Sequence, residues 1–469
     1  MRTSHTLLVL GACALFTACT DLQGGDKLAA PPPATSSLPA LPTRTTVVGL
    51  PGEAEQLRTS YSKLTQLLAK DPNDMKSWLK LSEVFITEAR ITGNYGPNYD
   101  AALDILDRVL ASTAGTNKQD MDLQGEALTL KAVIKLSQHK FDEALVLGEK
   151  AVVLDPHRAF NYGVLVDANV ELGNYARAVE MSDKMVGTRP DLRSYSRVSY
   201  LREIHGDVPG AMQAMDMAVK AGYPGSEETS WCRVQLGGLH ERNGAIDVAK
   251  QHYQQALAER PDYPFALAAL GRVEGKLKNY TEAEAHLNKA IAMMPDAHFY
   301  ETLARVYKAH GKTEAYAEHV EKAEEALIGL SGEPAHDHAV GTAHDHGKSG
   351  HGHSHETGLE MARYELEFHN DLPNALANAE HEFEHRENNI DVNAAMAAIL
   401  YAKGDAATAT IHIDLAKRTG STSAELLLIE GLIAAKKGQA AQGKKLIAQA
   451  FAKDPYLQHP LAEEGKSIL

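Results

Sequence analysis

The stretch QLGGLHERNGAIDVAKQHYQQALAERP, from Gln235 to Pro261, has the pattern of two amphipathic helices joined by a short turn. Gly244 in the turn can adopt a positive φ without steric cost. Ala249 is small enough to let the second helix approach the first closely. Pro261 ends the second helix because its ring removes an N–H donor and clashes with the preceding turn. The stretch therefore predicts a helical hairpin.

The same pattern recurs along the chain. In ALGRVEGKLKNYTEAEAHLNKAIAMMP, the hairpin is repeated 34 residues later, so that Ala283 takes the place of Ala249. An alanine followed twelve residues later by a proline occurs in four places: Ala144 and Pro156, Ala178 and Pro190, Ala249 and Pro261, and Ala283 and Pro295. A fixed period of this length is typical of stacked repeats.

These hairpins resemble the tetratricopeptide repeat (TPR) family, over Leu57 to Leu330 and again over Gly358 to Pro455. The resemblance implies an all-α solenoid in which helix pairs stack into a right-handed superhelix. The alternative is a set of unrelated amphipathic helices with chance spacing. The first unit is irregular, because 24 residues separate Trp78 from Ala102 where the family has 16. We therefore expect an insertion between its helices at Ile91 to Tyr99.

The N-terminus has the pattern of a targeting signal. An apolar run from Thr6 to Phe16 is too short to span a membrane, and it is followed by small residues and Cys19. This resembles a bacterial lipoprotein signal, which implies acylation of Cys19; the alternative is an ordinary cleaved secretory signal. The Pro-, Ser-, Thr- and Ala-rich stretch from Lys27 to Thr43 predicts an extended tether.

The chain is accordingly divided into six segments. They are a signal peptide (1–18), a tether (19–52), a helical array (53–330), a histidine-rich loop (331–357), C-terminal helical repeats (358–457) and a tail (458–469). The net charge of −15 argues against nucleic acid as a partner. The lipid at Cys19 would be the only membrane attachment. Cys232, in an apolar-periodic helix, is expected to be a core residue.

Histidine is concentrated between Ala335 and Glu356, in a segment whose glycines and Pro334 disfavour any helix. We expect a disordered surface loop that resembles the histidine-rich loops of metal transporters and storage proteins. Neutral imidazole binds Zn²⁺, Ni²⁺ and Cu²⁺, so weak binding of one of these ions is predicted. The alternative is a solvated spacer. The seven candidate ligands are His336, His338, His344, His346, His351, His353 and His355.

The motif HEFEH, from His381 to His385, fits the HExxH pattern of zinc peptidases. However, Phe383 belongs to an apolar stripe with Leu372 and Leu376, which places the two histidines on the opposite, solvent-facing side of the helix. No third ligand is evident. We therefore expect either a plain solvated face or an accessory metal pair, and we predict no enzymatic activity.

In the family, the first helix of each repeat lines the concave face. Alignment of the repeats places these residues there as a candidate partner-binding groove: Trp231, Glu241, Arg242, Phe265, Arg272, Lys276 and Arg305. A group of cations with two aromatic rings favours an acidic or C-terminal peptide, because arginine pairs well with carboxylates. The alternative interpretation is a repeat surface with internal ion pairs.

The sequence thus predicts a lipid-anchored TPR scaffold at the inner or outer membrane, facing the periplasm of a Gram-negative-type bacterium. It would bind partner proteins or peptides through its concave face and buffer or deliver Zn, Ni or Cu through the histidine-rich loop. The first alternative is an envelope-assembly scaffold in which that loop is incidental. The second is an HExxH zinc peptidase.

Overall fold

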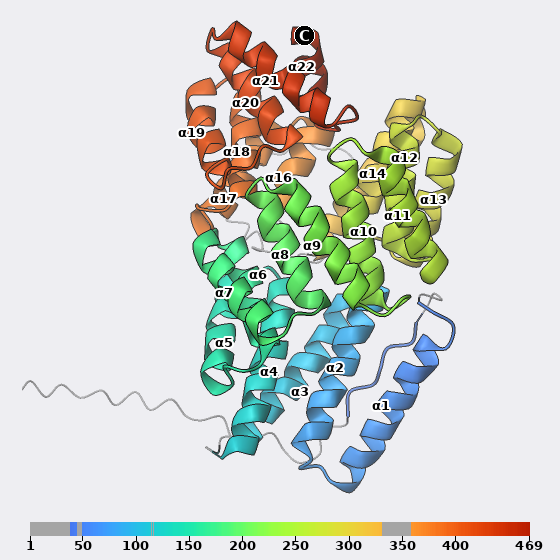
Figure 1. The fold of residues 1–469 in the computed structure, drawn as a ribbon. Coiled ribbons are helices and arrows are strands. Elements are labelled where there is room, and N and C mark those ends of the chain that lie inside the picture. Colours follow the sequence, from blue (N-terminus) through green and yellow to red (C-terminus); the bar gives the residue numbers. More distant parts are fainter. Residues whose placement is uncertain (1–37, 45–48, 114, 116, 331–357) are drawn as a thin grey trace, which may run out of the picture. The chain divides into compact units, whose positions relative to one another are not determined.

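The computed structural model describes residues 38–44, 49–113, 115, 117–330 and 358–469. Within these ranges the secondary structure consists of helices, with no β-strand (Figure 1). The predicted all-α, TPR-like solenoid is confirmed. The signal peptide, Cys19 and the histidine-rich segment 331–357 lie outside the described residues, and so do the predictions made for them.

The first half of the described chain contains α1 (Glu53–Lys70), α2 (Met75–Thr92), α3 (Tyr95–Ser112), α4 (Lys118–Ser137), α5 (Phe141–Leu154), α6 (Ala159–Glu171), α7 (Tyr175–Thr188), α8 (Leu192–Ile204), α9 (Val208–Ala221), α10 (Glu227–Glu241) and α11 (Ile246–Glu259). The second half contains α12 (Pro264–Lys276), α13 (Tyr280–Met293), α14 (Ala297–His310), α15 (Thr313–Leu330), α16 (Gly358–Tyr364), the π-helix η1 (Glu365–His369), α17 (Leu372–His385), α18 (Ile390–Ala402), α19 (Ala406–Ala416), α20 (Ala424–Lys436), α21 (Ala440–Lys453) and α22 (Ala462–Ile468).

Consecutive helices pack as hairpins, from α2 with α3 to α20 with α21. Small residues allow the close packing that the sequence predicted. Ala249 and Ala256 on α11 are fully buried, and Gly237 on α10 faces Tyr253 so closely that a Cβ atom would lie 2.4 Å from its ring. The repeat alanines Ala144, Ala178 and Ala283 are fully buried as well. The spacing of small residues therefore determines how the hairpins close.

The expected insertion at Ile91 to Tyr99 is wrong, because these residues are largely helical. Helix α2 continues to Thr92, and α3 begins at Tyr95 after Gly93, an αL residue with φ of 71°, and Asn94. Each of these helices is 18 residues long, whereas α6 has 13. The extra residues of the first repeat therefore lengthen both helices by more than one turn.

Repeats that are far apart in sequence contact each other through their turns. Arg386, at the end of α17, forms an ion pair of 2.8 Å with Glu171 at the end of α6. Asn389 donates a hydrogen bond to the carbonyl of Glu171, and the Ile390 N–H donates to the hydroxyl of Tyr175 at 2.8 Å. Figure 1 shows α17 beside the α6–α7 hairpin. The C-terminal repeats thus pack directly on earlier ones.

Gly173 makes this contact possible. Its φ is 75°, and a Cβ atom there would lie 2.3 Å from the carbonyl carbon of Asn388. Arg418 also donates a hydrogen bond to the Gly173 carbonyl, and Thr419 donates to the carbonyl of Ile204. Glycine in this turn therefore has two functions, because it permits the αL backbone and leaves room for a neighbouring turn.

The ends of the described chain also pack onto the helices. Arg44, within the predicted tether, forms a buried ion pair with Glu88 on α2 at 2.6 Å, and the Tyr61 hydroxyl donates to the Pro39 carbonyl. The predicted tail contains α22, which packs against α20 and α21. The C-terminal part of the tether and the tail are therefore attached to the helical body.

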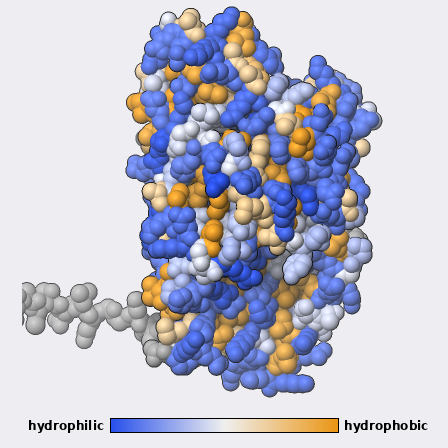
Figure 2. All heavy atoms as spheres, in the orientation of Figure 1, coloured by the Kyte–Doolittle hydropathy of each residue, from blue (hydrophilic) through white to orange (hydrophobic). Residues whose placement is uncertain are grey.

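None of the helices in the described ranges is both long and apolar enough to cross a membrane. The face drawn in Figure 2 is mostly hydrophilic, with hydrophobic residues in scattered patches. Cys232 on α10 is fully buried, as the sequence predicted, and burial raises the pKa of its thiol to about 12. This thiol stays protonated at neutral pH and is a core residue.

Candidate functional site

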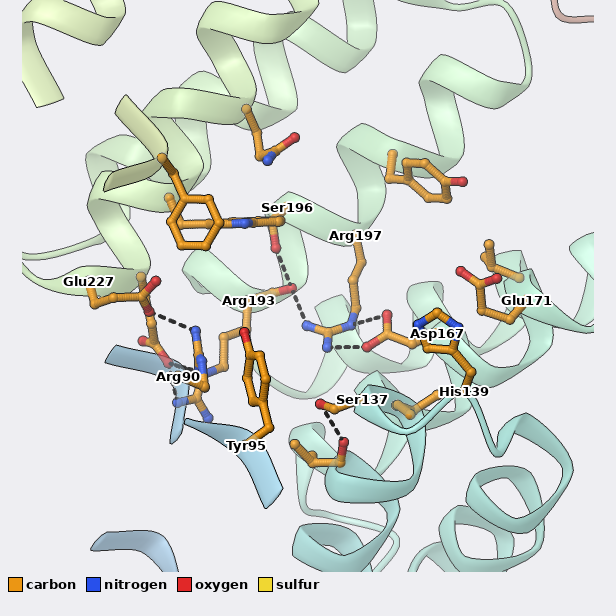
Figure 3. Close-up of a pocket in the computed structure, with 18 of the residues that line it drawn as sticks. Arg90, Tyr95, Ser137, His139, Asp167, Glu171, Arg193, Ser196, Arg197 and Glu227 are labelled. Atoms are coloured by element: carbon orange, nitrogen blue, oxygen red, sulfur yellow. Dashed lines mark hydrogen bonds and ion pairs between the residues drawn. The ribbon is translucent and has the colours of Figure 1, made fainter. Parts of the chain in front are cut away.

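The described residues enclose a cavity of about 1250 Å³. Its walls come mainly from α4, α6, α8 and α10, which are first helices of successive hairpins, and from α3. Further residues belong to α2, α9, α12, α14, α15 and α16. Figure 3 shows a part of this lining. The volume exceeds the roughly 300–1,000 Å³ of ordinary small-molecule pockets. The cavity therefore has room for a segment of peptide.

The arginines of the wall are fixed by carboxylates of the chain itself. Arg197 on α8 donates to both carboxylate oxygens of Asp167 on α6, with 2.8 Å between Nε and Oδ1, and also donates to the Arg193 carbonyl (Figure 3). The other three wall arginines are paired in a similar way: Arg90 with Glu227 at 2.8 Å, Arg193 with Glu228 at 2.6 Å, and Arg242 with Glu203 at 2.8 Å.

Carboxylates outnumber guanidinium groups in the lining. The cavity is lined by the four arginines named above and by seven carboxylates: Asp167, Glu171, Glu203, Glu227, Glu228, Asp296 and Glu360. Oε2 of Glu360 is buried and has no hydrogen-bond partner among the described residues. Each arginine already has a carboxylate, and Glu171 is paired with Arg386 from outside the lining. The buried oxygen of Glu360 is therefore the acceptor that the wall offers to a ligand.

The pKa of the Glu171 carboxyl group reflects this environment. Burial raises the pKa of its carboxyl group to about 7, although Arg386 counteracts the shift; Asp391 and Glu360 raise it further. A carboxyl group with this pKa is partly protonated at neutral pH. A cation in the cavity would favour the ionised form, because an opposite charge stabilises a carboxylate.

Exposed aromatic rings complete the wall. Trp231 on α10 is 39% exposed and Tyr200 on α8 is 38% exposed, and both line the cavity. Tyr95, at the start of α3, points into the same space (Figure 3), and burial raises its pKa to about 12. These rings are neutral at physiological pH, and their faces attract cations as well as apolar groups.

His298 adds a further positive charge to the wall. Nδ1 of its ring lies 3.6 Å from Oδ1 of Asp296, and the interaction with this carboxylate raises the pKa of His298 to about 9. The histidine is therefore protonated at neutral pH and neutralises Asp296. Since Glu171 is paired with Arg386, the buried acceptor left for a ligand is Oε2 of Glu360 on α16.

The structure separates the seven predicted groove residues into two groups. Trp231, Arg242 and Phe265 line the cavity. Glu241, Arg272 and Lys276 form an internal network: Arg272 donates to both oxygens of the buried Glu241 at 2.8 and 2.9 Å, and Lys276 lies 3.0 Å from it. Burial alone would raise the pKa of Glu241, but these cations and a hydrogen bond from Tyr253 hold it well below its usual range.

Arg305 is also occupied. It donates to both oxygens of Glu367 on η1, at 2.6 and 2.7 Å, and lies 3.2 Å from Glu301. The cations Arg272, Lys276 and Arg305 thus have carboxylate partners within the chain, as the alternative interpretation of the groove expected. An acidic ligand at these positions would have to displace a carboxylate that is already bound.

The HEFEH helix is α17. His385 is exposed, the centroid of the His381 ring lies 5.2 Å from that of His385, and Phe383 packs against the C-terminal core. Glu382, the residue in the position of a peptidase general base, is buried and accepts a hydrogen bond from Arg386 at 2.7 Å. This carboxylate is therefore a partner in a buried ion pair. Metal binding by the two histidines remains a prediction.

A different set of metal-type ligands is found in the described ranges. Glu324 on α15 and Glu365 and His369 on η1 bring three ligand atoms within 4.8 Å of one another. His369 carried no separate prediction from the sequence. The spacing of Glu365 and His369, one turn apart, is visible in the sequence, but Glu324 is brought to them only by the fold.

Several cavity residues also had no sequence prediction. Asp167 and Glu171, and likewise Arg193 and Arg197, recur four residues apart on first helices of hairpins, which places each pair on one face. This spacing could have been used to predict that these residues line the concave face. Tyr95 falls in the expected insertion, so its position could not be inferred before the lengths of α2 and α3 were known.

A family model of the tetratricopeptide repeat matches residues 242–306. No curated protein was found to match the sequence. Solved structures with a similar fold include PilF of Pseudomonas aeruginosa (17% identity, TM-score 0.37, 45% of this chain and 94% of that one), a tetratricopeptide repeat protein from Parabacteroides merdae (14%, 0.33, 59% and 98%) and human IFIT1 (12%, 0.42, 85% and 87%).

Because these TM-scores are low, the assignment depends on the matched family model and on the helix pairs themselves. Hairpins equivalent to the matched one extend on both sides of it, with the same buried alanines and αL turn glycines. The described chain is therefore an all-α solenoid of tetratricopeptide-like helix pairs, with a tetratricopeptide repeat match at residues 242–306.

Proposed function

We propose that this chain is a protein-binding scaffold whose cavity holds an extended, lysine- or arginine-containing segment of a partner protein. The observation that carries the proposal is the charge of the wall. All four arginines of the lining are paired with carboxylates, Asp296 is paired with His298 and Glu171 with Arg386, whereas Glu360 has a buried oxygen without a hydrogen-bond partner among the described residues. A cationic side chain would gain a partner in this wall without displacing one.

The aromatic rings support the same ligand chemistry. Trp231 and Tyr200 can cover the aliphatic stem of a lysine or stack on a guanidinium group. The first helices of TPR-like hairpins present such long concave surfaces to extended peptides. This proposal replaces the acidic ligand that the sequence alone favoured, because the arginines on which that ligand depended are already bound.

A direct test compares two labelled probes, decalysine and decaglutamate, by fluorescence anisotropy. We expect decalysine to bind at least about ten times more tightly, equivalent to about 1.4 kcal/mol. Glu360→Lys, inside the cavity, should weaken decalysine binding about ten-fold. Glu282→Lys on the exposed face of α13 changes the net charge equally and should have less than about a two-fold effect.

The net charge of −15 attracts any polycation. Because the two variants change this net charge equally, the comparison between them separates binding in the cavity from this general attraction. Equal losses in the two variants would mean that decalysine binds the general surface, and would contradict the cavity assignment. Tighter binding of decaglutamate would restore the acidic-ligand prediction.

We also propose that the scaffold is anchored through a lipid on Cys19 in the cell envelope and that its histidine-rich segment buffers a transition metal. Both proposals depend on the sequence, namely the short apolar run ending in TAC and the seven clustered histidines. The anchor predicts palmitate labelling that Cys19→Ala abolishes. Labelling of both proteins to the same level would exclude this modification.

A further inference from the structure

The three ligand-bearing side chains of Glu324, Glu365 and His369 are brought together where η1 packs on α15. Nδ1 of His369 lies 3.0 Å from Oε2 of Glu365, one turn earlier on the same helix. On the other side of the ring, Nε2 lies 4.0 Å from Oε2 of Glu324. The imidazole therefore lies between two carboxylates from different helices.

The surrounding contacts hold this arrangement in place. The hydroxyl of the buried Tyr364 donates to the Val320 carbonyl at 2.8 Å, one turn before Glu324 on α15. The Tyr364 ring packs edge-on against the His369 ring at 5.0 Å. Two bonds from Arg305 to Glu367 attach η1 to α14 as well. The π-helix is thus fixed to both neighbouring helices, and π-helical turns often occur at functional sites.

The chemistry of the donor set is that of a metal site. When Nδ1–H of His369 donates to Glu365, the ring orientation is fixed and Nε2 carries a lone pair, as is common for metal-binding histidines. Nε2 lies 3.4 Å from the Tyr364 hydroxyl, but this hydroxyl donates its proton to the Val320 carbonyl and not to the lone pair. Bonds of about 2.0–2.2 Å to an imidazole nitrogen and a carboxylate oxygen can span the gap between Nε2 and Glu324. Mixed nitrogen and oxygen ligands suit divalent transition metals better than Ca²⁺.

We propose that Glu324 and His369, supported by Glu365, bind one divalent transition-metal ion such as Zn²⁺ at the junction of α15 and η1. This site is distinct from the cavity and from the HEFEH histidines. Its ligands belong to packed helices, so the ordering cost of binding an ion there is small.

The site can be tested in the full-length chain after removal of the other candidate histidine ligands. Zn²⁺ is titrated by calorimetry at about pH 7.5, where an unperturbed histidine is mostly neutral, into a background in which asparagine replaces His336, His338, His344, His346, His351, His353, His355, His381 and His385. We expect one ion per chain in this background. In the same background, His369→Gln and Glu324→Gln should each weaken Zn²⁺ binding at least about ten-fold.

The chain offers a matched control in His310 on α14. Its Nδ1 lies 2.9 Å from Oε1 of Glu284, so it forms the same type of histidine–carboxylate pair, but Lys312 occupies the place of a third ligand. His310→Gln should leave Zn²⁺ affinity unchanged. Far-UV circular dichroism verifies that each variant keeps its helices, and Glu324, a partly exposed residue, can be replaced without opening the core.

Two results would overturn the site. One is retention of full Zn²⁺ affinity in either His369→Gln or Glu324→Gln with the helices intact. The other is an equal loss of affinity in the His310→Gln control. A plain ion pair between His369 and its neighbouring carboxylates would give the first of these results. Neither outcome depends on whether the cavity binds a peptide, so the two proposals fail independently.

Discussion

Replacing Arg386 with methionine is expected to lower the free energy of unfolding by about 3–5 kcal/mol. Arg386 is 5% exposed and binds two carboxylates, the buried Glu382 at 2.7 Å and Glu171 at 2.8 Å. Its guanidinium group also lies over the Phe141 ring at 4.9 Å. Methionine keeps much of the volume but leaves the carboxylate of Glu382 buried without a counter-ion, which is the costly part of the change.

The effect should also be local. Because Arg386 joins α17 to the end of α6, hydrogen exchange should accelerate at both places, which are 215 positions apart in sequence. Arg177→Met is the control, because the same substitution there removes an exposed ion pair with Glu180. It should leave the midpoint of urea denaturation unchanged. A methionine variant at position 386 as stable as the native chain would show that the C-terminal repeats do not depend on this contact.

Glu241→Gln is expected to cost about 3 kcal/mol of stability at neutral pH, because it leaves Arg272 and Lys276 without their carboxylate. Glu241 itself is 2% exposed. The introduced glutamine keeps the shape of the side chain and one acceptor oxygen. The loss of stability therefore measures the contribution of the negative charge of Glu241. Glu143→Gln, which removes an exposed partner of Lys135, should cost less than about 1 kcal/mol.

The effect of Glu241→Gln should depend on pH in a defined direction. The pKa of Glu241 is lower in the folded chain than its ordinary value of 4.5. A lowered pKa means that the stabilisation is fully present above pH 4.5 and is lost as the pH falls toward the folded value. The difference between native protein and variant should shrink by up to about 1.4 kcal/mol per pH unit below 4.5. The ion-pair account would be contradicted if the difference in free energy of unfolding between native protein and variant stayed constant from neutral pH to about one unit below pH 4.5.

Sequence patterns predicted the hairpins well because their determinants are local. The αL glycines Gly173, Gly206 and Gly244 have φ values of 75°, 81° and 77°, as expected for turns, and the repeat alanines are buried. The lengths of α2 and α3 were not predicted, because a longer helix and an inserted loop both add residues between Trp78 and Ala102.

The candidate site was less predictable, since it depends on partners from other repeats. Arg272 and Arg305 occupy similar positions in their repeats. The sequence of a repeat does not show whether a carboxylate from another repeat faces its arginine. Glu241 lies 31 residues before Arg272, and Glu367 lies 62 residues after Arg305. The sequence identified the positions on the concave face, whereas the ion pairs that neutralise them came from the fold.

The direct contacts between distant repeats were also beyond local patterns. The turn glycine Gly173 was predicted from its own hairpin, but Asn388 packs against it from a hairpin more than about 200 residues away. Such contacts bring α16, which carries Glu360, to the same cavity as α6 and α8. The charge of the cavity therefore depends on how the repeats stack as well as on their composition.

The central claim, that a cationic segment occupies the cavity, is tested most directly by photo-crosslinking. Benzoylphenylalanine is introduced either at Tyr200, in the cavity wall, or at Tyr223, an 85% exposed tyrosine outside it. Each protein is irradiated with labelled decalysine or decaglutamate. The account predicts crosslinks of decalysine at position 200, few at position 223, and none of decaglutamate at position 200. Equal crosslinking of decalysine at both positions, or a decaglutamate crosslink at position 200, would contradict it.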